Sequence, residues 1–139
     1  MFTRKKKEVQ LDEPGTIIGS GTTIKSSKLI GEKPVRIDGV FFGDIEVQSG
    51  VVIGEEGRVE GNINSPHVII AGKIKGNIES ESLHLTNTAD VNGDVKSTIL
   101  ITDEGSTLNG QYNVSQNGTN EIRNSIILNK ETVGDNNNE

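Results

Sequence analysis

Short apolar stretches, broken by glycine and polar residues, repeat along the chain from Val35 to about Val114. One marker occurs five times and consists of a glycine, a residue with a carboxylate or amide side chain, and an apolar residue. Its copies are Gly43-Asp44-Ile45, Gly61-Asn62-Ile63, Gly76-Asn77-Ile78, Gly93-Asp94-Val95 and Gly110-Gln111-Tyr112, which places the glycines at a nearly constant spacing. A second marker, a triplet with apolar ends, keeps the same period. Its copies are Val35-Arg36-Ile37, Val51-Val52-Ile53, Val68-Ile69-Ile70, Leu83-His84-Leu85 and Ile99-Leu100-Ile101.

Apolar residues two positions apart predict short β-strands with one buried face, and helical spacing is not sustained anywhere in the chain. A repeat of this length has room for three such strands, but one repeat cannot bury its apolar face alone. The repeats must therefore stack in register, with backbone hydrogen bonds between neighbours. We expect an all-β fold, a parallel β-helix of about six turns that includes a less regular first turn from Thr16 to Pro34.

The glycines of the first marker fit the corners of such a helix, because glycine takes positive φ where the chain bends between faces. The residue after each glycine forms a column of Asp44, Asn62, Asn77, Asp94 and Gln111. No two carboxylates are neighbours in this column. The order suits a stacked ladder of side-chain hydrogen bonds, because like charges ~5 Å apart repel and amides do not.

In the triplets, the outer residues should point inward and the middle residue outward, since successive side chains of a strand alternate. The outward column is then Arg36, Val52, Ile69, His84 and Leu100. Val52, Ile69 and Leu100 would form an exposed aliphatic strip, which suggests a lateral or partner contact. The alternative that a loop or tail covers this strip remains open.

The composition fits a narrow solenoid, with 31% hydrophobic residues, 3% aromatic residues and no tryptophan. The absence of cysteine excludes disulfides and cysteine-ligated metals and suits a reducing cell interior. No apolar run has the length of a membrane span or of a signal-peptide core. We expect one β-helix domain at 15–114, a flexible basic segment at 1–14 and a polar, disordered tail at 115–139. Within that tail, Ile126-Ile127-Leu128 are candidates for a short strand over the last turn.

The first residues combine an aromatic side chain with a basic cluster, Phe2, Arg4, Lys5, Lys6 and Lys7. The net charge is −6 and these four basic residues carry +4, so the remainder totals −10. An acidic body argues against nucleic acid as a ligand. Anionic lipid contributes ~1 kcal/mol per basic residue near its surface. The cluster therefore predicts a weak contact with an anionic membrane, which many copies on one polymer would strengthen; a solvated start is the alternative.

No pattern in the chain indicates catalysis, a metal site or a nucleotide site. His84 and His67 are expected on the surface, no metal-binding spacing occurs, and the glycines do not form a phosphate-binding loop. The predicted turns are short and carry no long loop from which a cleft is built. We therefore expect no enzyme activity and no cofactor, catalytic or metal-binding residues.

The two ends of a β-helix expose unpaired strand edges, which solenoids normally cover with a cap. Neither end of this array shows a strong cap, so end-to-end polymerisation is the physical expectation. We predict polymer contacts at Val35, Ile37, Phe41 and Phe42 early in the array, and at Leu108, Tyr112 and Val114 at its end. The sequence does not choose between a polar and a non-polar filament.

Several sequence motifs of the chain resemble those of the bactofilins. The resemblance rests on Val59-Glu60-Gly61-Asn62-Ile63, Val91-Asn92-Gly93-Asp94-Val95, the opening Gly15-Thr16-Ile17-Ile18-Gly19, Val35-Arg36-Ile37-Asp38-Gly39 and the basic start with Phe2. It covers roughly residues 15–114. It implies a right-handed parallel β-helix that polymerises without nucleotide into non-polar filaments. It also implies a cytoplasmic protein at the inner face of the cell membrane, which scaffolds unidentified proteins of cell shape, polar organisation or wall synthesis.

Two features depart from that family's pattern. Asp38-Gly39-Val40-Phe41-Phe42-Gly43 stands where the family more often has a charged residue within the turn, and the tail is Asn-rich instead of Pro-rich or basic. Partner choice therefore stays open. Two other classes also remain: a trimeric left-handed β-helix acyltransferase, suggested by the six-residue spacing of Ile18, Ile24 and Ile30, and a monomeric adaptor.

Overall fold

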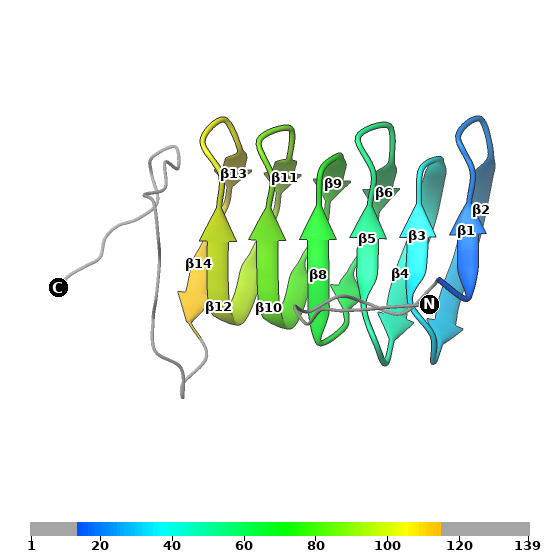
Figure 1. Cartoon of the computed structure of the whole chain (residues 1–139), viewed down its shortest axis with the longest axis horizontal. Coiled ribbons are helices and arrows are strands. Elements are labelled where there is room, and N and C mark those ends of the chain that lie inside the picture. Colours follow the sequence, from blue (N-terminus) through cyan, green and yellow to red (C-terminus); the bar gives the residue numbers. More distant parts are fainter. Residues whose placement is uncertain (1–13, 115–139) are drawn as a thin grey trace, which may run out of the picture.

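The computed structural model describes residues 14–114, and every regular element in this range is a β-strand (Figure 1). The strands are β1 (Thr16–Ile18), β2 (Thr23–Gly31), β3 (Val35–Ile37), β4 (Val40–Val47), β5 (Val51–Ile53), β6 (Arg58–Glu60), β7 (Ile63–Asn64), β8 (His67–Ile70), β9 (Lys73–Lys75), β10 (Ile78–Leu85), β11 (Asp90–Asn92), β12 (Val95–Thr102), β13 (Thr107–Asn109) and β14 (Tyr112–Val114).

The strands stack as six parallel rungs, each of which has three faces. The first face carries β1, β3, β5, β8, the second half of β10 and the second half of β12, in that order. The second face carries the first parts of β2 and β4, then β6, β9, β11 and β13. The remaining segments and β14 form the third face. The predicted all-β parallel β-helix of about six turns is confirmed.

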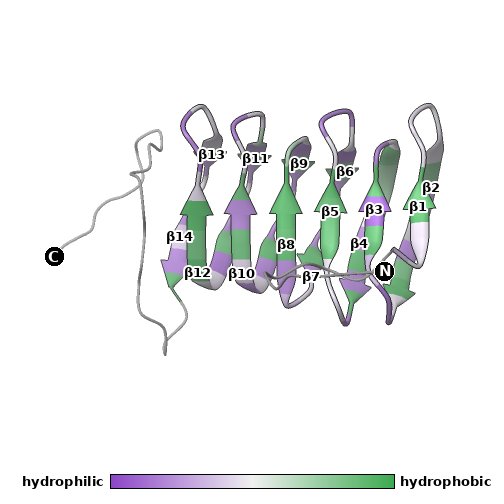
Figure 2. Cartoon of the chain, viewed as in Figure 1, coloured by the Kyte–Doolittle hydropathy of each residue, from purple (hydrophilic) through white to green (hydrophobic). Residues whose placement is uncertain are grey.

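The core is a set of inward columns that run along the rod. On the second face the inward residue stands two positions before each marker glycine, and none is more than 5% exposed: Phe41, Val59, Ile74, Val91 and Leu108. On the third face the residue after each polar marker points inward, and Ile45, Ile63, Ile78 and Val95 are buried. Figure 2 shows apolar residues on most strands together with polar ones, as expected for strands with one buried and one outward side. The rod is narrow enough that aliphatic side chains from three faces fill it.

The marker glycines stack directly on one another, and both their φ and their lack of a side chain are required. Gly43, Gly61, Gly76, Gly93 and Gly110 have φ between 145° and 152°. A Cβ on Gly76 would lie 2.0 Å from the carbonyl oxygen of Gly61, and the same clash recurs at each later rung. No side chain fits between two rungs at this corner, so the glycine spacing fixes the register of the stack.

The last triplet lies one residue away from its predicted register. In the stack, Leu83 pairs with Leu100, His84 with Ile101 and Leu85 with Thr102. Leu100 therefore points inward and is 3% exposed, whereas Ile101 points outward. The prediction that Leu100 belongs to the outward strip is wrong. Gly93 follows Gly76 by 17 residues, and the residue 17 positions after Leu83 is Leu100, which is therefore its equivalent in the next rung.

The six-residue spacing of Ile18, Ile24 and Ile30 does not describe the fold. Ile18 is buried, but Ile30 is 70% exposed on the outer side of β2. Each rung instead occupies the length of chain between successive marker glycines, and β2 contains an irregularity in register between Ile24 and Ser27. The first rung is therefore less regular than the others, as predicted.

Replacing Gly76 by alanine should destabilise the fold by about 2–4 kcal/mol, because the new Cβ meets the Gly61 carbonyl oxygen at a φ that only glycine adopts readily. Urea unfolding followed by circular dichroism at one protein concentration measures the loss. Gly19→Ala is the matched control, since a Cβ there has nothing within 4 Å. Equal unfolding midpoints for Gly76→Ala and Gly19→Ala would contradict the stacking account.

Candidate assembly surfaces

The two end rungs present the unpaired strand edges of the described part of the chain. At the N-terminal end these edges belong to β1 and β2, each of which pairs only with the next rung. At the C-terminal end they belong to the second half of β12, to β13 and to β14. All five large aliphatic residues that are exposed within residues 14–114 lie on these two rungs: Ile17, Ile30, Ile99, Ile101 and Val114.

The C-terminal rung carries no charged residue on its strands, which read Ile99–Thr102, Thr107–Asn109 and Tyr112–Val114. Leu108 is 5% exposed and closes the core, Tyr112 is half-buried, and Val114 is 38% exposed. Burial raises the pKa of Tyr112, against a smaller opposing effect of its hydrogen bond with Ser97. The tyrosine therefore stays neutral at physiological pH, and the edge remains uncharged.

The N-terminal rung is chemically different. Lys25 and Lys28 both lie on β2, and Lys28 Nζ is 3.3 Å from Glu46 Oε1. The register irregularity of β2 lies between Ile24 and Ser27, a span that includes Lys25. Lysines and bulges are the features that natural edge strands use to limit pairing with another chain. The C-terminal edge is consequently the better surface for strand-to-strand contact.

Part of the predicted N-terminal contact lies inside the stack. Val35, Ile37 and Phe41 are 2%, 0% and 1% exposed, because rung 1 covers them on one side and rung 3 on the other. Their assignment to a polymer-forming end is wrong. Phe42 is half-buried on the outer side of the second rung and is not at an end either. The irregular first turn, from Thr16 to Pro34, forms a complete rung. This rung, and not the one with Val35, Ile37 and Phe41, forms the N-terminal end of the stack.

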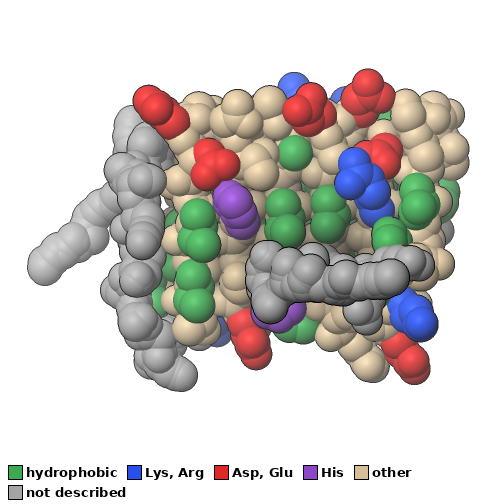
Figure 3. Space-filling model, viewed as in Figure 1, with side chains coloured by type: hydrophobic (Ala, Val, Ile, Leu, Met, Phe, Trp, Pro, Cys, Tyr) green, Lys and Arg blue, Asp and Glu red, His purple; other side chains and the backbone are tan. Residues whose placement is uncertain are grey.

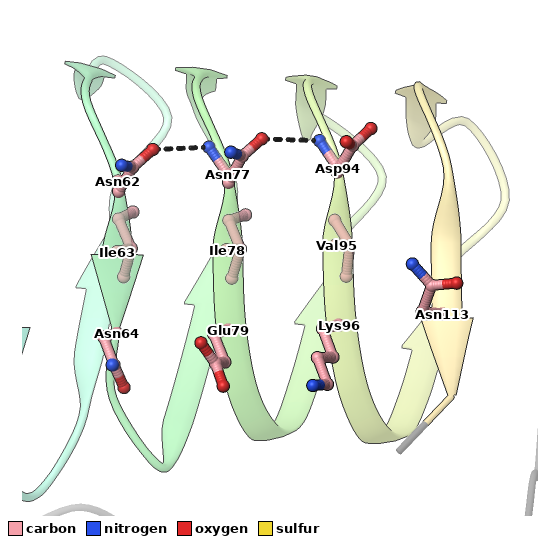
Figure 4. Close-up of a pocket in the computed structure, with 10 residues that line it drawn as sticks. All are labelled: Asn62, Ile63, Asn64, Asn77, Ile78, Glu79, Asp94, Val95, Lys96 and Asn113. Carbon is pink, nitrogen blue, oxygen red and sulfur yellow. Dashed lines mark hydrogen bonds between the residues drawn. The ribbon is translucent and has the colours of Figure 1, made fainter. Parts of the chain in front are cut away.

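The polar column forms a hydrogen-bond ladder along one corner of the rod (Figure 4). In each step the backbone N–H of one rung donates to the side-chain oxygen of the preceding rung. The donor–acceptor distances are 3.0 Å for Asn62 to Asp44, for Asn77 to Asn62 and for Asp94 to Asn77, and 3.2 Å for Gln111 to Asp94. Figure 4 draws the two middle steps. The predicted ladder exists, but it joins side chains to backbone instead of side chain to side chain.

A shallow groove runs beside this ladder on the third face. Asn62, Asn77 and Asp94 line one edge, Asn64, Glu79, Lys96 and Asn113 line the other, and Ile63, Ile78 and Val95 lie between them (Figure 4). The alternation of a strand explains the groove, because the middle residues point into the core. The ladder oxygens on its first edge already accept backbone hydrogen bonds. The groove is therefore a consequence of how the strands stack, and its lining residues do not form a recognisable binding or catalytic site.

An outward row of side chains follows the first face, with one residue from each rung in register. We call it the first-face strip: Ile17, Arg36, Val52, Ile69, His84 and Ile101. Figure 3 shows apolar side chains along this face, interrupted by basic and histidine side chains. Val52 and Ile69 point outward as predicted and are half-buried by their neighbours.

Both nitrogen-bearing residues of the first-face strip contact a carboxylate. Arg36 Nε donates to Asp38 Oδ2 at 2.8 Å, and this hydrogen bond raises the pKa of Arg36. His84 Nε2 lies 3.2 Å from Asp103 Oδ1. His84 is thus a surface residue, and His67 is exposed as well. Among residues 14–114, no group of three or more His, Asp or Glu side chains is placed to hold a metal ion.

The predicted membrane contacts Phe2, Arg4, Lys5, Lys6 and Lys7 lie outside the described residues, as does Ile126-Ile127-Leu128. In the described range there is no helix with the length and apolar character needed to cross a bilayer. The membrane contact therefore stays a prediction from the sequence.

Comparison with known proteins identifies one family. The bactofilin family model, described as polymer-forming cytoskeletal, matches residues 16–113. Bactofilin BacO of Myxococcus xanthus (strain DK1622) is 29% identical over 100 residues, which cover 71% of this chain and 79% of BacO. Bactofilin BacP of the same organism is 24% identical over 115 residues, which cover 82% of this chain. The match spans 48%, about half, of the length of BacP.

A solved structure has the same fold. The crystal structure of a point mutant of the bactofilin from Thermus thermophilus superposes with a TM-score of 0.59 at 30% sequence identity. The match covers 63% of this chain and 97% of the Thermus chain.

Replacing Asn77 by aspartate should destabilise the stack by about 0.5–1 kcal/mol at low salt, because a second carboxylate then stands ~4.8 Å from Asp94 while the acceptor is kept. The loss should shrink at high salt, which screens exposed charges. Asn77→Ala is the matched control. It removes the acceptor of the Asp94 N–H and should cost about 1 kcal/mol at any salt concentration. Urea unfolding at low and high salt measures both, and a salt-independent loss for Asn77→Asp would argue against the repulsion.

Proposed function

Because this chain belongs to the bactofilin family of polymer-forming cytoskeletal proteins, we propose that it assembles end to end, through its terminal rungs, into filaments without polarity. The observation that carries this proposal is the C-terminal rung. Within residues 14–114 it combines three strand edges that no other strand pairs, no charged residue on any of its strands, and the apolar residues Leu108, which closes the core, Tyr112 and Val114. A second copy on this rung supplies the backbone partners that the edge lacks.

The glycine corner favours joining like ends. At each step of the stack a glycine follows the preceding glycine, because a Cβ would meet a carbonyl oxygen at about 2 Å. A head-to-tail junction in continuous register would place the first rung of one copy on Gly110 of another. The first-rung position in this column is Ser27, which pairs with Gly43 in register and is not glycine. The steric rule of the stack therefore argues against a polar filament in favour of like-to-like junctions.

The assembly we propose needs no nucleotide. Its energy comes from covering the apolar end of the core and from pairing the free backbone edges. The marker glycines, a residue type that cradles phosphate in other proteins, are committed here to the close stacking of rungs. An uncharged edge and a formed core are sufficient for one copy to act as a template for the next.

We further propose that the filament lies at the inner face of the cell membrane and serves as a scaffold for cell-shape or wall-related proteins. Phe2 and the four basic residues that follow would contact anionic lipid at ~1 kcal/mol per basic residue. One copy would bind weakly, but a filament holds many copies, so each further contact is intramolecular. The family and the basic start support this part of the proposal.

Replacing Leu108 or Tyr112 by arginine should reduce the polymer to monomers or short oligomers, because a charge is then placed at the apolar end of the core that the junction would cover. Sedimentation and negative-stain microscopy measure assembly, and circular dichroism verifies the fold. Asn109→Arg is the matched control, since Asn109 is exposed and lies on the same strand as Leu108. Polymers of unchanged length in both Leu108→Arg and Tyr112→Arg would refute the assignment of the C-terminal contact.

Cysteine cross-linking distinguishes like-to-like from head-to-tail junctions, because the natural chain has no cysteine. Filaments of Gln111→Cys, treated with a flexible bis-maleimide that spans the end rung, should yield covalent dimers and no larger species. Filaments of Thr16→Cys should do the same at the other end. Glu79→Cys, which is in the middle of the rod, controls for contacts elsewhere. A head-to-tail filament would bring no two like cysteines together at a junction and would yield no such dimers.

Deleting residues 2–7 should abolish co-flotation with anionic liposomes and leave polymerisation intact, because it removes Phe2 and the basic cluster. A variant with Arg4, Lys5, Lys6 and Lys7 replaced by glutamine keeps the length of the segment and separates the charge from the aromatic residue. Liposome flotation and sedimentation of the same preparations provide the two measurements. If the deleted chain floated as well as the intact chain, the membrane contact would have to lie elsewhere.

A further inference from the structure

The dipeptide Asn-Gly occurs twice within residues 14–114, at Asn92-Gly93 and at Asn109-Gly110, on neighbouring rungs of the glycine corner. In such a pair the glycine nitrogen can attack the side-chain carbonyl carbon of the asparagine before it. Glycine hinders this attack least, because it has no side chain. The two copies share their conformation, with φ of 145° at Gly93 and 149° at Gly110, and both asparagines are exposed. They form a matched pair that differs in its place in the stack.

The hydrogen bond of the glycine nitrogen distinguishes the two copies. Along the corner, each glycine N–H donates to the carbonyl oxygen of the residue that precedes the next glycine: Gly61 to Lys75 at 3.0 Å, Gly76 to Asn92 at 2.9 Å and Gly93 to Asn109 at 2.9 Å. Gly110 comes next in this column, but no rung follows it within residues 14–114. Gly93 is half-buried, whereas Gly110 is exposed.

The two pairs also differ in how many strands hold them in place. Attack on the asparagine needs the glycine nitrogen free of its hydrogen bond and the extended strand locally opened. Asn92 lies on β11, which pairs with β9 on one side and with β13 on the other. Asn109 lies on β13, which pairs only with β11 among the described strands. A strand at the end of the stack opens at a lower free energy than an interior strand, so the reaction is favoured at Asn109.

The contact between the two asparagine side chains acts in the opposite direction. Asn109 Nδ2 donates to Asn92 Oδ1 at 3.2 Å. This hydrogen bond draws electron density from the Asn92 carbonyl group, which favours attack on Asn92. A faster reaction at Asn109 would therefore report its place on the end rung.

We propose that Asn109-Gly110 is a self-modification site, at which an unassembled chain converts asparagine to isoaspartate, and that the end-to-end junction protects it. The protection rests on the proposed function. The Gly110 nitrogen loses its proton to water and forms a bond to Cγ of Asn109, and the side-chain nitrogen takes up a proton and leaves as ammonia. Water then opens the cyclic succinimide at either carbonyl group, which gives aspartate or, mainly, isoaspartate. The net change consumes one water and releases one ammonia.

The isoaspartyl product is the one that alters the end rung. Asn109 points outward, so a carboxylate on its side chain leaves the end of the core untouched. Isoaspartate instead adds a methylene group to the backbone just before Gly110. The extra atom displaces Gly110 from the corner column and shifts β14, whose Tyr112 pairs with Val95. A chain that stays unassembled therefore loses the surface that the junction needs.

A second copy on the C-terminal rung would prevent the reaction. It supplies a backbone acceptor for the Gly110 N–H and gives β13 a neighbour on its open side, as β13 itself does for β11. Asn109 would then be held as Asn92 is held in the interior. The modification thus marks chains by the time they spend with this rung uncovered.

Peptide mapping by mass spectrometry follows both sites in the full chain, which carries Asn117→Gln to remove the Asn-Gly pair outside the described residues. An isoaspartyl methyltransferase assay identifies the isoaspartate. In chains diluted below the concentration at which filaments form, we expect Asn109 to convert about tenfold or more faster than Asn92. In filaments we expect the rate at Asn109 to fall towards that of Asn92. Equal rates at the two sites in dilute chains would overturn the assignment of the site.

Electron microscopy of the same samples separates this inference from the proposed function. Equal conversion of Asn109 in dilute chains and in visible filaments would overturn the protection and leave filament formation standing. A lack of filaments at every concentration would instead refute the proposed function. The comparison of Asn109 with Asn92 in dilute chains needs no filaments, so it decides the modification site in either case.

Ageing tests the consequence for assembly. Dilute chains are kept at mildly alkaline pH, which speeds loss of the glycine proton, and are then concentrated; circular dichroism verifies the fold. We expect the polymer yield to fall in proportion to the isoaspartate formed at Asn109, whereas Asn109→Gln, which cyclises far more slowly, keeps its yield. Fresh Asn109→Asp is the matched control for charge and should polymerise like the natural chain. Undiminished polymerisation of aged chains that carry the isoaspartate would overturn its effect on assembly.

Discussion

The structure depends on one close contact, the approach of each marker glycine to the carbonyl oxygen of the glycine one rung before it. At Gly61, Gly76, Gly93 and Gly110 a Cβ would lie no more than 2.0 Å from that oxygen. The contact is local, but it sets how flat the rungs lie and how far each is displaced along the rod. Flat rungs bring the inward residues into straight columns and the residue after each glycine into hydrogen-bonding distance of the next rung. The core and the ladder are thus consequences of the same spacing.

A stack that is held together in this way has chemically different ends, even though its middle is uniform. Every interior rung has a neighbour on both sides, but the last rung offers free edges without charged residues, and the first offers β2 with Lys25 and Lys28. Glycine at each step also gives the stack a direction, because only the following rung must lack a side chain. The end rungs therefore differ in charge and in the residue at the glycine corner, which is Ser27 on the first rung and Gly110 on the last.

The sides of the rod offer a different kind of surface from its ends. A contact at an end rung would complete backbone hydrogen bonds and cover the end of the core, so one such contact between two copies would be strong. The first-face strip is one side chain wide, and its aliphatic residues are interrupted by Arg36 and His84, each of which contacts a carboxylate. A single row of side chains of this kind offers little area, whereas an end rung offers backbone edges and the end of the core.

The sequence by itself determined the repeat, the strand character and most of the inward positions, because the near-constant spacing of the marker glycines favours one in-register stack. It also identified Leu108, Tyr112 and Val114 as members of the last rung. Hydropathy alone misled at Ile99-Leu100-Ile101, where three apolar residues allow two registers and only pairing with Leu83 selects Leu100 as the inward one. Only the tertiary structure decided that the irregular segment from Thr16 to Pro34 closes over Val35, Ile37 and Phe41, and that the ladder oxygens accept from backbone. The physical reason is that periodicity fixes what repeats, whereas the ends and the hydrogen-bond partners depend on which strands lie next to each other in space.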